Sequence, residues 1–359
     1  MSVEKIVITG GPCAGKSTAL SKIQSELTQL GYKVLFVSES ATEFITNGLT
    51  PWEYKNFQHY LMKYQLMKES ICEKAAESSD QKTIIVCDRG ALDSKAYMTP
   101  EEFESVLKEL NTSEVELRDN YGAVFHLVTA AKGAVEFYTT ANNSARTETP
   151  EQAAEADDKT VAAWTGHPHL RIIDNSTDFE EKIRRLLVEI TSYLGEPEPF
   201  EIERKFLIEY PDVKWLESLP NCQKVEIIQT YLKSDNPDDE VRVRQRGLNG
   251  SFTYTKTTKR KISDIKRMEL ERRLTKDEYL ALLMQADTSR HQIRKTRYCM
   301  SYDNCYLELD IYPFWDDKAI LEIELAHEDD PISIPANIKV IKEVTDDESF
   351  KNANLAITY

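Results

Sequence analysis

The chain is 359 residues long, which suggests about two domains, each large enough to bury its own core. A hydrophobic content of 41% and a charged content of 30% are typical of a soluble globular protein, and no apolar run is long enough to span a membrane. The net charge of −16, with no basic excess in either half, argues against a DNA-binding protein and means that an anionic ligand must meet a local basic cluster.

The six cysteines are scattered and none forms a C-x-x-C pair, which predicts reduced thiols. A strand-like run, IVITG, begins at Ile6 and leaves no room for a signal peptide before it. We therefore expect a cytoplasmic protein without a transmembrane segment.

The first motif begins at Gly10, the last residue of the strand-like run IVITG. Residues 10–17 read GGPCAGKS and fit G-x-x-x-x-G-K-[ST] at every fixed position, and a helical pattern follows until Gly31. Strand, glycine-rich loop and helix together predict a loop whose N–H groups hold the phosphates of ATP or GTP. Lys16 is expected to reach the β- and γ-phosphates, and Ser17 to bind Mg²⁺. The expected nucleotide contacts are Gly10, Gly11, Pro12, Cys13, Ala14, Gly15, Lys16, Ser17 and Thr18.

Apolar runs and helical segments alternate through the rest of the first half. The further strand candidates are residues 34–37, 83–87, 124–128 and 170–173. This alternation predicts an α/β domain with a parallel sheet, flanking helices and ligands at the carboxyl ends of the strands. Two helix starts are marked by capping Thr-Pro pairs at Thr99 and Thr149.

Three polar residues are candidates for the chemistry of this half. Asp88 follows a strand and suits an indirect contact to Mg²⁺ or a base that orients an acceptor hydroxyl, although a turn residue is the alternative. Glu39 also follows a strand, and could contact the acceptor or cap the next helix. Arg146 lies between the fourth and fifth strands, where it could reach the developing charge or remain a surface arginine.

With these residues, the first half of the chain resembles the P-loop kinases that act on nucleosides, nucleotides and nicotinamide riboside. The matching positions are the 10–17 loop, Glu39, Asp88-Arg89 and the segment around Arg146, and the resemblance extends to about residue 194. It implies nucleotide binding and, as an inference, kinase activity. The loop would equally serve a nucleotide-controlled switch.

A short linker separates the two halves. A capping box at Thr177 and Glu180 predicts the last helix of the first half, Gly195 ends it, and Glu-Pro-Glu-Pro follows. The predicted domains are therefore residues 1–195 and 200–359, joined by residues 196–199.

The second half opens with FEIERKFLI at residues 200–208. In a strand, Glu201, Glu203 and Lys205 project from one face. Two carboxylates and an ammonium group are costly to bury unless they bind a cation and an anion together, and a solvated strand face is the alternative.

Similar charged alternations recur along the second half, often with apolar residues between the charges. They predict an α+β domain built on a closed antiparallel β-barrel with a charged interior, covered by helices such as the one starting at Thr275. The candidate ligands for Mg²⁺ or Mn²⁺ are Glu201, Glu203, Glu269, Glu271, Asp310, Glu322 and Glu324. The candidate phosphate contacts are Lys205, Arg242, Arg244, Arg246, Lys256, Arg294 and Arg297.

This inventory suits a linear triphosphate that is attacked by water with the help of a metal. We expect Glu201, Glu203 and Lys205 to carry this reaction, as Asp88 and Glu39 would carry that of the first half.

The E-x-E-x-K signature, the basic strand and the paired-acid strands resemble a CYTH domain, also called a triphosphate tunnel metalloenzyme, as does the ending Glu343-Val-Thr345-Asp with Asn354-Leu-Ala. The resemblance covers residues 200 to about 357. It implies hydrolysis of inorganic triphosphate, thiamine triphosphate or an RNA 5′-triphosphate, or adenylate cyclisation, and the sequence does not choose among them.

A P-loop domain followed by a CYTH domain also resembles the TRPL translocation defect family, whose members bind nucleotides and acidic phospholipids as regulators. Two alternatives to a triphosphatase therefore stay open. One is a nucleotide-gated protein that captures an anionic ligand without turnover, and the other is an adenylate cyclase.

Overall fold

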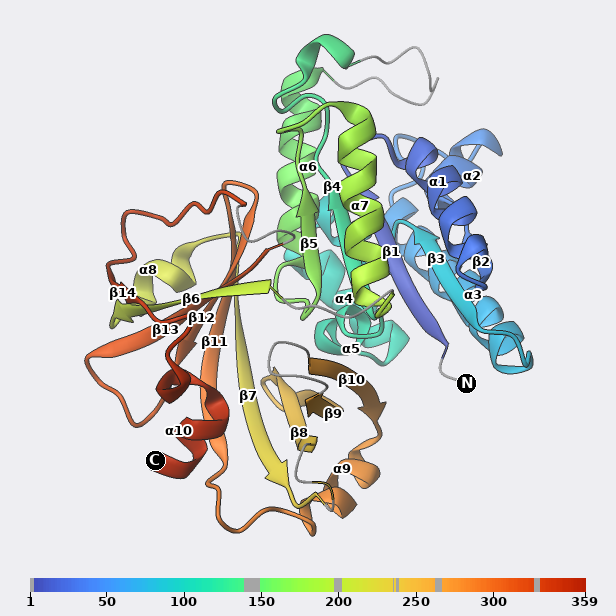
Figure 1. Cartoon of the computed structure of the whole chain (residues 1–359). Helices are drawn as coiled ribbons and strands as arrows, with labels where there is room; N and C mark the ends of the chain where they lie inside the picture. The colour runs from blue at the N-terminus through green and yellow to red at the C-terminus, as the bar shows by residue number, and fades with distance from the viewer. Residues whose placement is uncertain are drawn as a thin grey trace. The chain divides into compact units, whose positions relative to one another are not determined.

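The computed structural model describes residues 3–138, 149–196, 202–234, 236, 239–261, 267–325 and 330–359. Within these ranges it describes the backbone alone at residues 260–261 and 267–269, and the side chains everywhere else. The chain divides into two compact units, Met1–Ile190 and Thr191–Tyr359 (Figure 1). Of the predicted linker at 196–199, only Glu196 is described, so the predicted domain boundaries stay a prediction. Predictions for Glu201, Arg146 and the side chain of Glu269 also lie outside the described residues.

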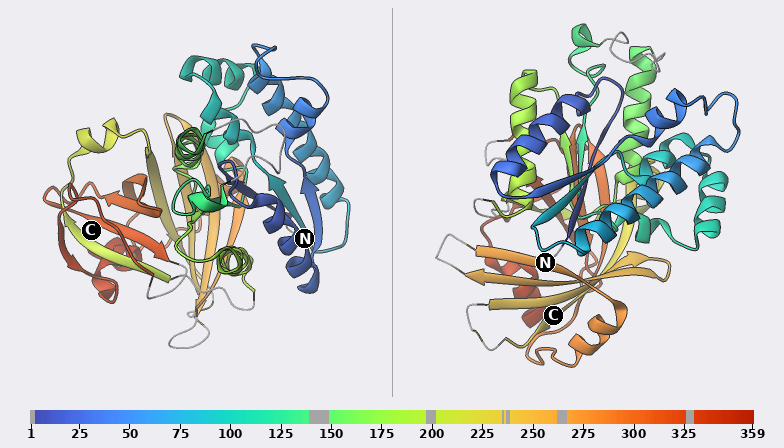
Figure 2. Two further views of the ribbon diagram at one scale, coloured as in Figure 1. Left: turned by 90° about the horizontal axis from the view of Figure 1, so that it is seen from above. Right: turned by 90° about the vertical axis from the view of Figure 1, so that its right-hand side faces the viewer.

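The first unit contains the predicted parallel sheet. Its strands have the spatial order β2-β3-β1-β4-β5 and pair in parallel throughout. Helices cover both faces of the sheet (Figures 1 and 2), which is why its central strands are apolar and buried along nearly their whole length. The strands are β1 (Glu4–Gly10), β2 (Lys33–Val37), β3 (Thr83–Asp88), β4 (Ala123–Leu127) and β5 (Leu170–Ile173).

Local sequence signals set several helix starts in this unit. Thr99 and Thr149 form the predicted capping boxes, each followed by proline. The predicted box at Thr177 is wrong, because α7 begins at Phe179 and Asp178 accepts a hydrogen bond from the Glu181 N–H at 2.9 Å. The helices are α1 (Lys16–Gln29), α2 (Ser40–Thr46), α3 (Phe57–Glu77), η1 (Ala91–Tyr97), α4 (Pro100–Leu110), α5 (Glu114–Arg118), η2 (Val135–Phe137), α6 (Pro150–Trp164) and α7 (Phe179–Tyr193).

The second unit is built on a large antiparallel sheet with the order β10-β9-β8-β7-β11-β12-β13-β6-β14. Figures 1 and 2 show that this sheet is strongly curved. Its outer strands β10 and β14 do not pair with one another within the described ranges, so closure into a barrel stays a prediction. The strands are β6 (Ile202–Glu209), β7 (Cys222–Leu232), β8 (Asp239–Leu248), β9 (Ser251–Lys261), β10 (Arg267–Leu274), β11 (Ile293–Tyr302), β12 (Cys305–Ile311), β13 (Lys318–Leu325) and β14 (Val340–Glu343).

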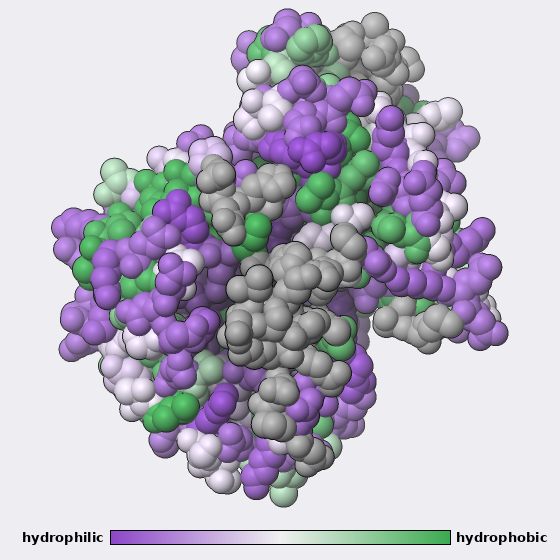
Figure 3. Space-filling view, in the orientation of Figure 1, coloured by the Kyte–Doolittle hydropathy of each residue, from purple (hydrophilic) through white to green (hydrophobic). Residues whose placement is uncertain are grey.

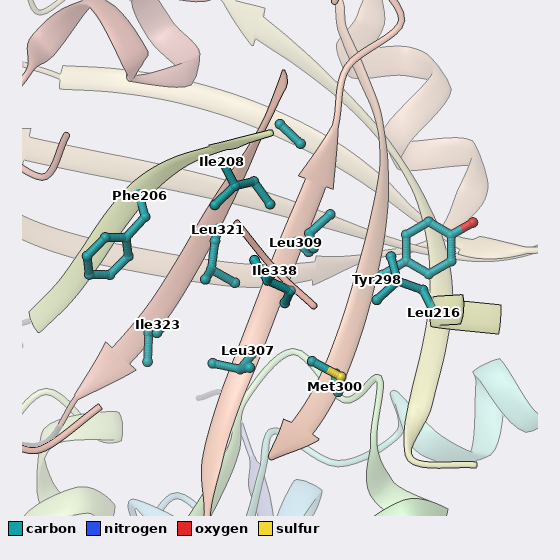
Figure 4. Packing of buried hydrophobic residues seen from close by; sticks show 11 residues of the cluster. Phe206, Ile208, Leu216, Tyr298, Met300, Leu307, Leu309, Leu321, Ile323 and Ile338 are labelled. Carbon is teal, nitrogen blue, oxygen red and sulfur yellow. The ribbon is translucent and has the colours of Figure 1, made fainter. Parts of the chain in front are cut away.

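The two faces of this sheet differ in chemistry. We call the face that carries Lys205 the inner face, and the face that carries Phe206 the outer face. The outer face is apolar, and Figure 4 shows side chains of β6, β11, β12 and β13 packed together there. Helix α8 (Val213–Ser218) adds Leu216 to this cluster. The predicted helix α9 (Lys276–Leu283), capped by Thr275, covers a second apolar patch through Tyr279.

A short C-terminal helix, α10 (Asn352–Thr358), follows η3 (Glu348–Phe350) and packs on the inner face. Its Leu355 and Ala356 lie against apolar residues at one end of that face, which are Leu207, Tyr231, Ile293, Tyr312 and Ile320. The inner face therefore has an apolar end, and its charged residues occupy the remainder.

The surface in the view of Figure 3 is mainly hydrophilic, in keeping with the high charge content. Within the part of the chain that the structure describes, no helix combines the length and the apolar character needed to cross a membrane.

Candidate functional site

The predicted phosphate-binding loop lies between β1 and α1, and its glycines are required by the backbone. Gly10 has φ 143° and Gly15 has φ 93°, a region that favours glycine. A Cβ atom on Gly10 would lie 2.1 Å from the carbonyl oxygen of Leu127, and one on Gly15 would lie 2.5 Å from the ring of Phe179. The loop is thus closely packed against β4 and α7.

Lys16 is the charged centre of this loop. Its buried ammonium group donates to the carbonyl oxygens of Gly10 at 3.3 Å and Gly11 at 3.4 Å. Burial and the nearby Arg89 lower the pKa of Lys16, against the opposite effect of three nearby carboxylates. Ser17 and Thr18 are exposed on the first turn of α1, so their hydroxyl groups are accessible to a ligand.

Two of those carboxylates are the predicted Glu39 and Asp88, and both lie at the carboxyl edge of the sheet. Asp88 ends β3, and its buried Oδ1 has no hydrogen-bond partner among the described residues. Burial raises the pKa of Asp88, while Lys16 opposes this shift. Glu39 occupies the N-cap position of α2, but its side chain makes no capping bond. It accepts instead from Arg89 Nε at 2.7 Å.

The Arg89 guanidinium and Lys16 lower the pKa of Glu39 to about 2, although burial opposes them. The structure therefore brings together one buried ammonium group, one ionised carboxylate, and a second carboxylate whose Oδ1 has no hydrogen-bond partner among the described residues. A phosphate group and its cation would complement this set of charges.

Sequence reasoning missed Asp93, which orients Arg89. Asp93 is buried in η1 and accepts from Arg89 Nη1 at 3.0 Å, from the Gly90 N–H at 2.8 Å and from Trp164 Nε1 at 3.2 Å. Arg89 itself has φ 68°, unusual for a residue other than glycine. In DRGALD, residues 88–93, Asp93 lies four positions after Arg89, a spacing that allows an ion pair. The sequence alone does not single out this aspartate, because an aspartate in a short helix usually faces solvent.

The second candidate site is the charged part of the inner face in the other unit. Cross-strand register places Lys205 opposite Glu322, and Glu203 opposite Glu324. Glu322 in turn lies opposite Glu308. Residues opposite one another share a face of the sheet. Glu203 and Lys205 of the predicted E-x-E-x-K strand therefore lie on the same face as Glu322 and Glu324 of its neighbour β13.

Glu322 is held by cations on both of its oxygens. Lys205 Nζ lies 2.9 Å from Glu322 Oε1, and Arg297 Nη2 lies 2.6 Å from Oε2. Although burial opposes it, Lys295, Lys205 and Arg297 hold the pKa of Glu322 well below its usual value. Burial lowers and Glu322 raises the pKa of Lys205, and the net shift is upward. Glu322 is thus fixed and ionised.

Arg297 joins three carboxylates. Its Nε and Nη2 donate to the two oxygens of Asp310, both at 2.7 Å, and Nη1 pairs with Glu308. Lys295 Nζ also pairs with Asp310. All three nitrogens of the predicted phosphate contact Arg297 are therefore engaged by acids of the sheet.

The basic strand β8 lies further along the same face. Arg242, Arg244 and Arg246 project from the inner face, opposite Tyr231, Gln229 and Ile227 of β7. Arg246 is buried, and the other two are partly exposed. On β10, Glu271 accepts a hydrogen bond from Thr257 Oγ1 of β9 at 2.9 Å. Thr257 lies opposite Arg242, so Glu271 is on the same face of the sheet as the arginines of β8.

Two predicted phosphate contacts do not belong to this cluster. Lys256 pairs in register with Val243, whose side chain belongs to the outer-face patch under α9. Arg294 is exposed and lies one position out of phase with the inner-face residues Lys295 and Arg297. Both side chains therefore point from the outer face, because side chains alternate along a strand.

Lys295 and Glu308 are the corresponding residues that sequence reasoning missed. Both are buried on the inner face and pair with members of the cluster. Lys295 lies two positions before Arg297, and Glu308 lies two positions before Asp310. Residues two positions apart in a strand share a face, and this spacing was the signal that could have identified them.

Glu203 and Glu324 are the residues that best fit a metal. They lie directly opposite each other, and Lys205 Nζ lies 3.4 Å from Glu203 Oε1. Two like charges in that position repel, which favours further positive charge beside them. Mg²⁺ binds through one or two carboxylates together with substrate phosphates. Among the residues that the structure describes, no group of three or more acidic, histidine or cysteine side chains gathers to hold a metal without such a substrate.

Comparison with known proteins gives one family match. A family model described as an AAA domain matches residues 5–182, which include the phosphate-binding loop, Glu39 and Asp88. No curated protein matches the chain.

Several solved structures are similar to part of the chain. An inorganic triphosphatase is 27% identical, with 45% of this chain and 96% of that chain covered and a TM-score of 0.32. The PH1012 protein from Pyrococcus horikoshii OT3 is 20% identical, with coverages of 36% and 81% and a TM-score of 0.28. A putative adenylyl cyclase from Hippeastrum, described as having a dominant triphosphatase activity, is 13% identical, with coverages of 35% and 80% and a TM-score of 0.25. Residues 5–182 thus match an AAA domain, and the similar solved structures include triphosphatases.

Proposed function

We propose that the Thr191–Tyr359 unit hydrolyses a linear triphosphate, inorganic or organic, with Mg²⁺ or Mn²⁺ as cofactor. The observation that carries this proposal is the opposed pair Glu203 and Glu324 on the face that also bears Lys205 and the three arginines of β8. Opposed carboxylates favour a cation, and a row of cations favours a chain of phosphates. A metal-bound triphosphate satisfies both requirements at once.

The residues of the inner face have distinct roles in this proposal. Glu203 and Glu324 hold the metal, which when bound polarises a phosphoryl group and activates water. Lys205 is fixed by Glu322 beside this pair, so its ammonium group contacts the phosphate nearest to the metal. Arg242, Arg244 and Arg246 neutralise the remaining phosphates. Positioning and charge neutralisation are the main requirements of phosphoryl transfer.

The test is metal-dependent release of phosphate from tripolyphosphate, ATP, GTP, thiamine triphosphate and an RNA 5′-triphosphate by the full chain. Glu203→Gln is expected to lower the rate by about 100-fold or more, because metal ligands and their supports have effects of that order. Arg244→Ala should raise KM. Lys256→Ala, on the outer face of the neighbouring strand, is the matched control and should leave both constants unchanged.

Two outcomes would favour the alternatives. No hydrolysis of any triphosphate by micromolar protein, together with tight nucleotide binding, would support a nucleotide-gated protein that holds an anionic ligand such as an acidic phospholipid. Formation of cyclic AMP from ATP would support an adenylate cyclase.

We also propose that the Met1–Ile190 unit binds ATP or GTP and uses it in phosphoryl transfer. The support is Lys16 in its loop beside Asp88, whose Oδ1 has no hydrogen-bond partner among the described residues. Lys16→Ala should abolish the binding of ADP, which is not a triphosphate substrate of the other unit, as measured by calorimetry. Asp88→Asn should leave binding intact but lower phosphoryl transfer. Unchanged turnover in Asp88→Asn would remove the proposed role of Asp88.

A further inference from the structure

A buried lysine on α7 contacts the phosphate-binding loop from the side. Lys182 lies in the first turn of α7 with 2% of its surface exposed. Its Nζ donates to the Val128 carbonyl at 2.6 Å, to Asn175 Oδ1 at 2.7 Å and to the Ala14 carbonyl at 3.3 Å. An ammonium group has three N–H donors, so these three acceptors use all of them.

The three acceptors belong to segments that shape the nucleotide site. Ala14 immediately precedes Gly15 and Lys16 in the loop, and Val128 follows the end of β4. Asn175 Nδ2 in turn donates to the carbonyls of Thr129 at 2.8 Å and Lys132 at 2.7 Å. Lys182 thus joins the loop to the segment after β4 and to the turn before α7.

The charged groups around Lys182 come from three helices and from the segment after β5. Asp157 of α6 and Asp174 after β5 favour the charged amine, whereas Lys16 of α1 and Arg185 of α7 disfavour it. Burial has the largest effect and also disfavours the charge, and together these groups lower the pKa of Lys182 to about 8.

We propose that Lys182 is a positioning residue that holds the phosphate-binding loop in its nucleotide-binding shape only while its amine carries three protons. This inference depends on the proposed nucleotide binding of the same unit. A neutral amine has two N–H donors for three acceptors. The contact to Ala14, the longest of the three, is the one expected to be lost, and the adjacent loop N–H groups then lose their fixed orientation.

The expected pH dependence separates positioning from a structural role. Because the pKa of Lys182 is lower in the folded protein than its usual value of 10.5, the unfolded chain binds more protons between about pH 8 and pH 10.5. The contribution of Lys182 to the free energy of unfolding therefore rises with pH across this window. Nucleotide affinity should fall over the same window, so stability and binding move in opposite directions.

The experiment measures binding of Mg²⁺-ADP to the full chain by calorimetry between pH 7 and pH 9.5, with thermal unfolding measured in the same buffers. ADP is used because it is not a triphosphate substrate of the other unit. The wild type should lose roughly 10-fold in affinity, the value of one hydrogen bond of about 1.4 kcal/mol. Lys182→Met should bind weakly at every pH. Lys182→Arg, which stays charged, should lose less affinity than the wild type at pH 9.5, because only the lowered pKa of Lys16, which acts in both proteins, then remains. Lys159→Met, an exposed lysine on α6, should show the wild-type profile.

Three results would overturn the inference. They are equal wild-type affinity at pH 7 and pH 9.5, wild-type affinity in Lys182→Met, and a fall in the affinity of Lys182→Arg equal to that of the wild type. If Lys182→Met does not fold, the comparison of wild type with Lys182→Arg decides. A wild type that binds neither ADP nor ATP at any pH would overturn the proposed function of this unit and the inference with it, whereas the three results above leave nucleotide binding in place.

Discussion

At the scale of single residues, Arg297 shows how the inner face of the second unit is organised. Its guanidinium group is largely buried and contacts Asp310, Glu308 and Glu322. Four of its five N–H donors are thus committed to carboxylates of the sheet. These contacts orient Glu322, and the phosphate contact expected of Arg297 from the sequence stays a prediction.

This role predicts a large loss of stability when Arg297 is removed. Arg297→Met leaves three carboxylates without their shared cation, and breaking a buried ion pair costs about 3–5 kcal/mol. Arg294→Met, an exposed outer-face change three positions earlier, should alter the free energy of unfolding by less than about 0.5 kcal/mol. Urea denaturation of both variants is the measurement. Similar values for the two would show that the contacts of Arg297 contribute no more than those of a surface arginine.

The same residues show which parts of the site were predictable. Alternation along one strand is local, so it correctly grouped Glu203 with Lys205 and the three arginines of β8. Lys256 was misassigned because the face of β9 relative to β8 depends on register, which arises from pairing between distant segments. Lys182 could not be predicted, since its polar partners lie on the loop, after β4 and after β5.

At the scale of elements, helix signals were predictable where they are local. The capping boxes at Thr99, Thr149 and Thr275 each depend on residues three positions apart, and all three form. The parallel sheet followed from the alternation of apolar runs and helices. Closure of the antiparallel sheet is different, because it depends on pairing between β10 and β14, which are far apart in sequence.

Helix α10 is the element whose role was not foreseen. A helix of seven residues is not stable in isolation, so packing must hold it in place. Leu355 has 2% of its surface exposed and packs against the apolar end of the inner face, whereas Ile357 on the same helix is 59% exposed. The helix therefore covers apolar side chains that would otherwise adjoin the charged site.

Substitutions in α10 should differ accordingly. Leu355→Ala should lower the free energy of unfolding by about 2–4 kcal/mol, the usual cost of a cavity in a core. Ile357→Ala is the matched control and should cost less than about 0.5 kcal/mol. Chemical denaturation measures both. Equal costs would mean that α10 does not pack on the sheet in solution as it does in the structure.

At the scale of the whole molecule, the chain contains two compact units, each with its own sheet and its own buried residues. The two candidate sites lie in different units, with Lys16 in one and Glu203 in the other. A ligand that binds only the native state stabilises the unit that binds it by RT ln(1 + [L]/Kd), about 2.7 kcal/mol at 100 times Kd. Each ligand should therefore act mainly on one unit.

Scanning calorimetry of the full chain should consequently resolve two unfolding transitions that respond to different ligands. Mg²⁺-ADP should raise only the midpoint of the Met1–Ile190 unit, and Lys16→Ala should abolish this shift. Mn²⁺ with tripolyphosphate should raise the midpoint of the Thr191–Tyr359 unit, and Glu203→Gln should abolish that shift while the response to ADP is retained. The loop could also bind tripolyphosphate, so the decisive sample is Lys16→Ala, in which the second transition alone should respond. Loss of that response in Lys16→Ala would show that the two units unfold or bind ligands as one.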